Sequence, residues 1–303
     1  MMFLFSLFLS SELFAQEVIE TKKYAMVKIP KGTFLMNDCD NGGKPDPYCP
    51  ENIVAHKVEI TYDYFMMQSE VTRALYQDIM GTDPSFFSTG ETKSCTNCPV
   101  DSVTWIDVLT FANALSKSEG REECYTISET KITWKGLECK GWRLPTEAEW
   151  ERGAKADEGY RYSGSNDRKE AGWFAENAAL SDGSRAAPQA KCSKPKNGWN
   201  LCDMTGNVSE WTWDILSSAI SEYPTLSTDP VGYTGKTRGQ NPYRIIKGFD
   251  IGSDCGNPCD ERCSCTLGLP ECQRERCSIA EMDTLKYYEY SNTVGFRLVR
   301  TAN

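Results

Sequence analysis

The sequence predicts an α+β fold that is rich in loops and held together by disulfides. Short runs of β-branched and aromatic residues alternate with only a few amphipathic segments of helical length. Turns rich in Gly, Asn, Asp and Pro separate these runs, and no internal repeat is visible. The chain has 303 residues and 14 cysteines, an even number that is consistent with paired disulfides. These features favour a mixed fold over a doubly wound parallel sheet.

Two predicted strands open the chain, and two predicted helices follow them. Residues 24–36 and 57–67 are rich in β-branched and aromatic side chains, so each is expected to be a strand. Residues 72–80 place apolar side chains on one side and stop before Gly81, which predicts a helix. Residues 105–119 repeat this pattern at a spacing of three to four residues.

A third helix, a short one, is expected to begin at Thr146. Thr146 and Glu149 have the spacing of a capping box, in which each side chain accepts a hydrogen bond from the backbone amide of the other residue. Trp150 is expected to anchor the core, and Arg143 to pair with a neighbouring carboxylate at the corner that leads into this helix. These charged residues are therefore interpreted as structural rather than catalytic.

Composition and charge limit the classes of partner. Hydrophobic residues make up 40% of the chain and charged residues 25%, as in ordinary globular proteins, and we expect one domain over residues 16–303. The formal net charge is -10, with no basic block to offset it. The sequence therefore predicts no nucleic-acid partner and no anionic membrane surface as a binding site.

The first 15 residues resemble a secretory signal. An apolar run from Met1 to Leu9 is followed by Ser-Ser-Glu and a small residue at Ala15, so residues 1–15 are expected to be a signal peptide, with a buried strand as the alternative. The run is much shorter than the roughly 20 residues that span a bilayer, and we expect no stable membrane insertion after its removal. The mature protein is expected in the periplasm or outside the cell.

Cysteine spacing predicts several loop-closing disulfides, as expected for an exported protein. Eight cysteines fall into local pairs: Cys39 with Cys49, Cys95 with Cys98, Cys124 with Cys139 across an expected hairpin, and Cys192 with Cys202. A zinc site is the alternative for the CxxC at Cys95, but no second CxxC accompanies it. The other six are Cys255, Cys259, Cys263, Cys265, Cys272 and Cys277, which lie within 23 residues and allow fifteen pairings.

Six segments occur in an order that resembles one protein family. They are MVKIPKGTFLM, SEVTRALYQ, PVDSVTW, GWRLPTEAEWERGAKA, NGWNLCDMTGNVSEW and NTVGFRLVR. Together they resemble the sulfatase-modifying-factor, or formylglycine-generating-enzyme, family over about residues 24–300, and RLPTEAEWE and DMTGNVSEW are the most specific. The resemblance implies the formylglycine-generating-enzyme variant of the C-type-lectin-like fold.

The resemblance also implies structural calcium in the second half of the chain. By this resemblance the candidate oxygen ligands are Asn177, Asp182, Asn207 and Glu210. The compact carboxylate and amide oxygens around Asp203, Asn207 and Glu210 are also of the kind that either hold turns or bind a hard cation. Ser209 stands where the family often has Trp, which removes an aromatic contact but no ligand oxygen.

A copper site is the second metal centre that the resemblance implies. Enzymes of this family bind Cu(I) through two cysteine thiolates and use dioxygen to oxidise a client cysteine to formylglycine, and soft sulfur suits this soft metal. Cys272 matches the second ligand of the family. Leu267 occupies the position of the first ligand, so the nearest upstream cysteine, Cys265, is the candidate partner. Cys265 and Cys272 are thus the predicted catalytic and copper-binding residues, with a cysteine-containing client protein or peptide as partner.

Enzymatic activity is left open by the sequence. Residues 247–251, Lys-Gly-Phe-Asp-Ile, replace the usual Arg-Gly-Gly-Ser-Trp, and the six C-terminal cysteines could all be oxidised. The chain would then be a non-catalytic, calcium-stabilised binding module of C-type-lectin-like fold. A nonheme iron site with two histidines is excluded because His56 is the only histidine, and no GxSxG nucleophile elbow is present.

Overall fold

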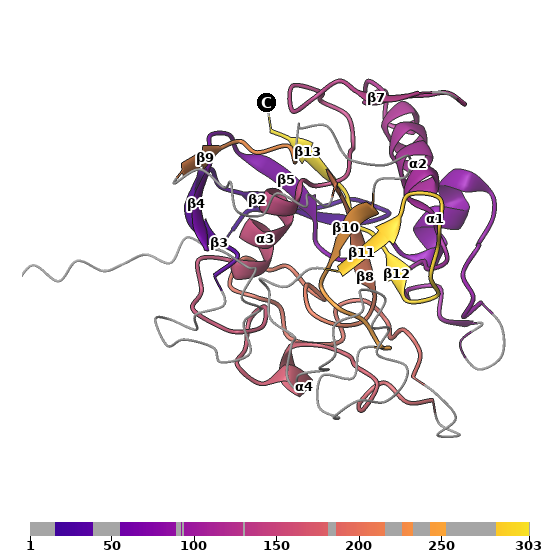
Figure 1. The fold of residues 1–303 in the computed structure, drawn as a ribbon. Coiled ribbons are helices and arrows are strands. Elements are labelled where there is room, and N and C mark those ends of the chain that lie inside the picture. The colour runs from indigo at the N-terminus through magenta and orange to yellow at the C-terminus, as the bar shows by residue number, and fades with distance from the viewer. Residues whose placement is uncertain are drawn as a thin grey trace, which may run out of the picture.

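The computed structural model describes residues 16–38, 55–88, 92, 94–129, 131–180, 186–215, 226–232, 243–252 and 283–302. In chain order its elements are β1 (Val18–Glu20), β2 (Ala25–Ile29), β3 (Gly32–Met36), β4 (His56–Ile60), β5 (Tyr64–Met67), α1 (Arg73–Met80), α2 (Trp105–Ser118), β6 (Tyr125–Ile127), β7 (Ile132–Trp134), α3 (Glu147–Lys155), α4 (Arg168–Ala171), β8 (Ser209–Ile215), β9 (Leu226–Thr228), β10 (Tyr243–Lys247), β11 (Asp283–Lys286), β12 (Val294–Gly295) and β13 (Val299–Thr301). Short strands, few helices and long loops confirm the predicted α+β class (Figure 1).

The strands of the described residues form small, separate sheets. One sheet has the order β1-β2-β5-β13, so the last strand of the chain pairs beside its first strands. A second has the order β11-β10-β8-β12, in which β12 runs parallel to β8. β3, β4 and β9 form a third, and β6 and β7 form a hairpin. The first two sheets lie next to each other in the middle of the molecule (Figure 1).

Each of the two predicted N-terminal strands is in fact two strands, which corrects that prediction. Residues 24–36 divide into β2 and β3, and residues 57–67 divide into β4 and β5. Pro30 lies at the first break, where its missing amide hydrogen cannot join a ladder. The second break lies beside the first, because Asp63 Oδ1 accepts a hydrogen bond from Lys31 N at 2.9 Å. The breaks let the chain leave the β2–β5 pair and form the β3–β4 pair in another sheet.

The three predicted helices are confirmed, as are the predicted stop of the first at Gly81 and the predicted capping box of the third. Thr72 caps α1 by accepting from Leu75 N, and Gly81 ends it with a φ of 79°. α3 begins at the predicted capping box of Thr146 and Glu149. The guanidinium of Arg143 donates to both carboxylate oxygens of Glu149 at 2.7 Å, as expected for the corner before α3.

The core divides between two sides of the β-sheets. On one side α1 and α2 pack together, and Trp105 and Trp211 are buried with them (Figure 1). On the other side α3 lies against β3, β8 and β10, and Trp150 is fully buried. His56, expected in a loop before a strand, is instead the buried first residue of β4.

The loops between α3 and β8 are held by amide side chains and by a disulfide. Asn197 Nδ2 donates to Gly153 O at 2.9 Å, and its Oδ1 accepts from Trp199 N and Leu201 N. Such bonds replace the backbone ladders that these residues lack, since buried peptide groups need partners. At Gly206, with a φ of 77°, a Cβ would lie 2.5 Å from Trp173 O, so only glycine fits this turn.

Three of the predicted disulfides are confirmed. Cys95–Cys98, Cys124–Cys139 and Cys192–Cys202 are bonded, with Cα–Cα distances of 5.3, 5.7 and 5.1 Å. Cys39, Cys49 and the six cysteines between 255 and 277 lie outside the described residues, as does the predicted signal peptide. Within the described ranges, every helix is too short or too polar to cross a bilayer.

Candidate functional site

The predicted calcium ligands Asn177 and Asn207 hold loops through their amide groups. Asn177 Oδ1 accepts from Phe174 N at 2.7 Å, and its Nδ2 donates to Gly172 O at 3.0 Å. Asn207 Oδ1 accepts from Gln189 N at 2.9 Å, and its Nδ2 donates to Gln189 O at 3.3 Å. Asp182 lies outside the described residues.

The third described candidate, Glu210, is fully buried and paired with Arg297. The guanidinium Nη2 and Nε of Arg297 donate to the two carboxylate oxygens at 2.7 Å, and Trp150 Nε1 donates to Oε2 at 2.8 Å. Protein donors therefore contact the oxygens of Asn177, Asn207 and Glu210, and the structure does not show these three side chains as a shared ligand set. Calcium binding by this set stays a prediction.

Two other acidic side chains beside Glu210 have oxygens without partners. Glu70 is only 2% exposed, and among the described residues no hydrogen-bond donor contacts either of its carboxylate oxygens. Asp203 is 3% exposed; its Oδ2 accepts from Cys192 N at 2.6 Å, whereas its Oδ1 has no partner in the part of the chain that the structure describes. A buried carboxylate that lacks partners is costly, so these oxygens mark a place where another group is expected to bind.

Burial sets the protonation of this pair. It raises the pKa of Glu70 well above its usual range, and the nearby Asp203 raises it further. Burial also raises the pKa of Asp203 to about 6. Both groups thus resist ionisation unless a cation compensates their charge. We refer to Glu70, Asp203 and Glu210 together as the acidic centre.

Arg297 joins the two chain segments that carry the acidic centre. Its Nη1 donates to Gln68 O at 3.2 Å, at the end of β5, and its Nη2 donates to Cys202 O and Asp203 O at 2.9 and 3.1 Å. Cys202 N also donates to Gln68 O at 2.9 Å. The segments SEVT, CDMTGNVSE and GFR therefore meet around one guanidinium, although they are distant in sequence.

The unpartnered oxygens of the acidic centre are of the chemical kind that a hard divalent cation prefers. Calcium prefers carboxylate and carbonyl oxygens, and Glu70 and Asp203 offer buried oxygens that nothing else contacts in the described chain. Three ionised carboxylates beside the single guanidinium of Arg297 would leave two uncompensated negative charges, which one divalent cation balances. Asp203 was among the residues that the sequence singled out, but Glu70 was missed, because it follows the apolar β5 and resembles a solvent-facing residue.

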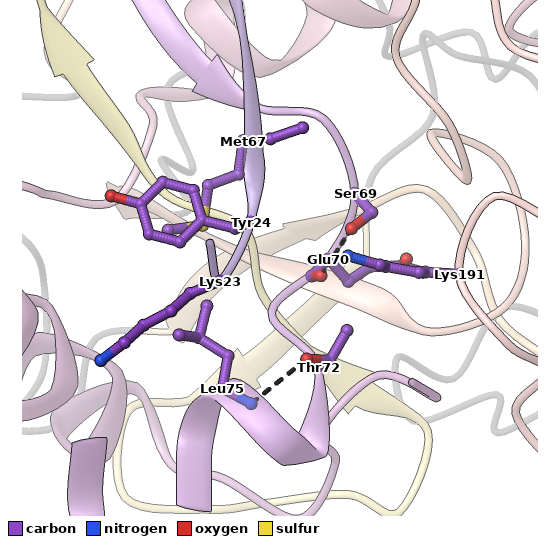
Figure 2. A pocket seen from close by; sticks show the side chains of 9 residues that line it. Lys23, Tyr24, Met67, Ser69, Glu70, Thr72, Leu75 and Lys191 are labelled. Atoms are coloured by element: carbon purple, nitrogen blue, oxygen red, sulfur yellow. Dashed lines mark hydrogen bonds between the residues drawn. The ribbon is translucent and has the colours of Figure 1, made fainter. Parts of the chain in front are cut away.

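A small surface depression leads toward Glu70. It is lined by Lys23, Tyr24, Ala25, Met67, Ser69, Glu70, Thr72, Leu75 and Lys191. Ser69 Oγ donates to Glu70 O at 3.0 Å, and Lys191 is one of the lining residues that Figure 2 labels. The small size of the depression excludes a bulky ligand.

A second surface feature is a group of exposed tyrosines at the end of the β10–β11 pair. Tyr243, Tyr288 and Tyr290 are 43%, 44% and 66% exposed. Lys286 Nζ lies 5.7 Å from the ring centres of both Tyr243 and Tyr288. We call these four residues the tyrosine surface. Exposed aromatic rings beside a cation are typical of binding surfaces, because Tyr supplies a large contact area with little loss of side-chain entropy.

The predicted copper ligands Cys265 and Cys272 lie outside the described residues. The segment before them begins with Lys247, which is buried and lies 3.2 Å from Glu151 Oε2 and 3.5 Å from Glu147 Oε1. Lys247, where the family usually has Arg, thus forms ion pairs with α3.

Comparison with family models identifies the family of the chain. A family model described as the sulfatase-modifying factor enzyme 1-like domain matches residues 11–302. A chaperone protein, LppX, from Paenibacillus barcinonensis is 31% identical over 180 residues, which is 50% of this chain and 62% of that protein, so the match spans less than two thirds of the relative.

Solved structures share the fold. Variable protein 1 of Treponema denticola superposes with a TM-score of 0.73 at 23% identity, covering 95% of this chain and 99% of that one. PvdO from Pseudomonas aeruginosa gives a TM-score of 0.64 at 19% identity, with 95% and 99% coverage. CarF gives 0.62 at 22% identity, with 92% and 99% coverage. Since the family model covers nearly the whole chain and the expected segments meet in one fold, the chain belongs to the sulfatase-modifying factor enzyme 1-like family.

Proposed function

We propose that the chain is an exported, calcium-stabilised binding module of this family that recognises another exported protein. The tyrosine surface is the observation that carries this proposal, because it presents three accessible rings and a lysine on a paired strand end. The three disulfides are consistent with export. The relative in P. barcinonensis is named a chaperone, a class of protein whose work is to bind other proteins.

The tyrosine surface predicts which substitutions abolish partner binding. Replacing Tyr288 and Tyr290 with Ala is expected to lower affinity for the partner by about 30- to 1,000-fold, since aromatic hot spots contribute about 2 kcal/mol each and such contributions are not strictly additive. Each variant is immobilised and exposed to the exported proteins of the source cell, and mass spectrometry quantifies how much of each protein is retained. Each retained protein is then purified, and its affinity for the variants is measured by titration.

Tyr160 supplies the matched control. It is 44% exposed, as Tyr288 is, and lies in the loops after α3, far along the chain from β11. A partner should be retained by the wild type and by Tyr160→Ala, but not by the double variant. If every retained protein binds the wild type, Tyr160→Ala and the double variant equally, the tyrosine surface is not the binding surface.

Calcium in this proposal is held by Glu70 and Asp203, next to the Glu210–Arg297 pair, and its role is to neutralise the buried carboxylates. Chelation with EDTA at neutral pH is expected to lower the melting temperature, because a ligand that binds only the folded state stabilises it by about 2.7 kcal/mol at 100 times its Kd. Differential scanning calorimetry with and without added Ca²⁺ measures the effect.

Two sets of variants separate the possible ligand sets. Glu70→Gln combined with Asp203→Asn should remove the response to Ca²⁺ and stabilise the chelated protein, since the substitutions remove the buried charges. Asn177→Ala, which lies in the set that the resemblance implied, should keep the response. A melting curve that ignores EDTA in the wild type would contradict calcium binding at either set.

A second candidate function is formylglycine generation by Cys265 and Cys272 with Cu(I) and dioxygen. It is favoured by the segment Cys272-Gln273-Arg274, which resembles the copper-ligand segment of the family. Counting free thiols in protein from an oxidising compartment and then titrating Cu(I) discriminates the two functions. The binding module predicts no free thiol at Cys272 and no copper uptake. Stoichiometric copper, with aldehyde formation in a cysteine peptide, would establish the oxidase instead.

A further inference from the structure

The Cys95–Cys98 disulfide differs from an ordinary structural crosslink in its exposure. Cys95 is half-buried, Thr96 and Asn97 are exposed, and Cys98 is buried. Cys95 is therefore the more exposed member of the pair and the one that an attacking thiolate is expected to reach. Access of this kind decides which disulfides take part in exchange.

The backbone around this disulfide is already fixed without it. Four backbone hydrogen bonds tie residues 95–98 to their surroundings: Cys95 N to Thr92 O at 3.0 Å, Ala74 N to Thr96 O at 2.9 Å, Lys191 N to Asn97 O at 3.0 Å and Arg73 N to Cys98 O at 3.0 Å. The bridge closes a loop of only three residues' separation, which constrains the unfolded chain less than a long loop does. The disulfide therefore contributes little to the stability of the fold, and its reduction leaves the turn in place.

The buried sulfur has a partner that suits the reduced state. Cys98 Sγ lies 3.1 Å from Pro188 O, so a Cys98 thiol can donate a hydrogen bond to this carbonyl once the disulfide opens. That bond stabilises the protonated thiol, and the accessible Cys95 is left as the sulfur that forms mixed disulfides.

We infer that Cys95–Cys98 is a redox-active disulfide that exchanges with dithiols of exported client proteins. A client thiolate attacks Cys95 Sγ, the Cys95–Cys98 bond breaks, and Cys98 leaves as a thiolate that takes a proton. The second client thiolate then attacks the client sulfur of the mixed disulfide, and Cys95 leaves. The client loses two electrons and two protons, and this chain gains them. A further disulfide of higher potential restores the oxidised pair.

The CxxC turn lies beside the small surface depression. Asn97 is bonded to Lys191, and Pro99 forms a bridge with Thr72. Lys191 and Thr72 both line the depression of Figure 2. The CxxC turn thus borders this depression. This inference does not depend on the tyrosine surface or on copper, since it uses neither.

The test uses the full chain and a synthetic peptide with two reduced cysteines as probe. Oxidation of the peptide by a stoichiometric amount of protein is expected, and the Cys95→Ser/Cys98→Ser double variant should lose it. Cys98→Ser alone should form a lasting mixed disulfide on Cys95 when it is given a single-cysteine peptide carried as its mixed disulfide with glutathione: the Cys95 thiolate attacks the peptide sulfur and glutathione leaves as the thiol. Peptide mass mapping identifies the product. The absence of peptide oxidation by the wild type, or equal oxidation by the double variant, would overturn the inference.

A second measurement works even if a variant fails to fold. Wild-type protein is equilibrated in glutathione buffers of graded potential, and free thiols are alkylated and mapped. Cys95–Cys98 should be reduced about tenfold more readily than Cys124–Cys139, a difference of about 30 mV. Both cysteines of that reference pair are buried. Equal resistance of the two disulfides under native conditions would leave Cys95–Cys98 a structural crosslink.

Discussion

Replacing Arg297 with Met is expected to destabilise the folded protein by about 3–5 kcal/mol, the cost of breaking a buried ion pair from one side. The Arg297 guanidinium is fully buried and donates to both oxygens of Glu210. Its removal leaves the three carboxylates of the acidic centre without their guanidinium. It also removes the donors to Gln68 O and Cys202 O that join two chain segments. Urea denaturation followed by fluorescence measures the change.

Two further variants make this prediction specific. Adding Glu210→Gln to Arg297→Met should recover part of the stability, because it removes one uncompensated buried charge. Lys28→Met breaks an exposed ion pair with Asp63 at 3.0 Å, and its cost should stay below about 1 kcal/mol. A loss for Arg297→Met as small as that of Lys28→Met would mean that the acidic centre is not ionised in the folded protein.

Local signals predicted the helices well because their causes lie within a few residues. The cap at Thr146 and the stop at Gly81 depend on neighbouring side chains and on backbone conformation. The Arg143–Glu149 pair was predictable for the same reason, since six residues separate its members. Disulfides between cysteines that are close in the sequence were predictable for the same reason.

The acidic centre was only partly predictable, because its contacts join distant residues. Glu210 was chosen as a calcium ligand from its motif, whereas its partner Arg297 lies 87 residues away. Glu70 carries no local sign of burial, and its neighbour Asp203 comes from another segment. The prediction of unbroken strands through Pro30 and Asp63 failed for a related reason. Apolar periodicity marks extended chain, but the choice of sheet depends on partners elsewhere in the sequence.

A second buried carboxyl makes the stability of the protein depend on pH. Asp214 lies in β8 with its side chain 6% exposed, and its Oδ2 accepts from Glu147 N at 2.8 Å. Burial, with a further contribution from Glu147, raises the pKa of Asp214 to about 8, although Arg244 acts in the opposite direction. In the unfolded chain an Asp titrates near pH 4. Between these values the folded state keeps a proton that the unfolded state has lost.

The sign of the effect follows from that difference in bound protons. Stability is fully present below about pH 4 and falls as pH rises toward 8, by at most about 5 kcal/mol for this group. Asp214→Asn keeps an oxygen acceptor for Glu147 N but cannot ionise. The variant should therefore match the wild type at pH 4–5 and become progressively more stable than it toward pH 8.5, as measured by urea denaturation at each pH.

Asp63→Asn is the control of opposite sign. The backbone amide of Lys31 and the ammonium of Lys28 lower the pKa of Asp63, so its carboxylate stabilises the fold above about pH 4. Its replacement should cost less than about 1 kcal/mol at neutral pH, because the pair is exposed to solvent. Other buried acids, such as Asp101 and Asp203, also titrate in this range, so the difference between each variant and the wild type isolates one group. Parallel pH profiles for Asp214→Asn and the wild type would show that Asp214 is already ionised in the fold.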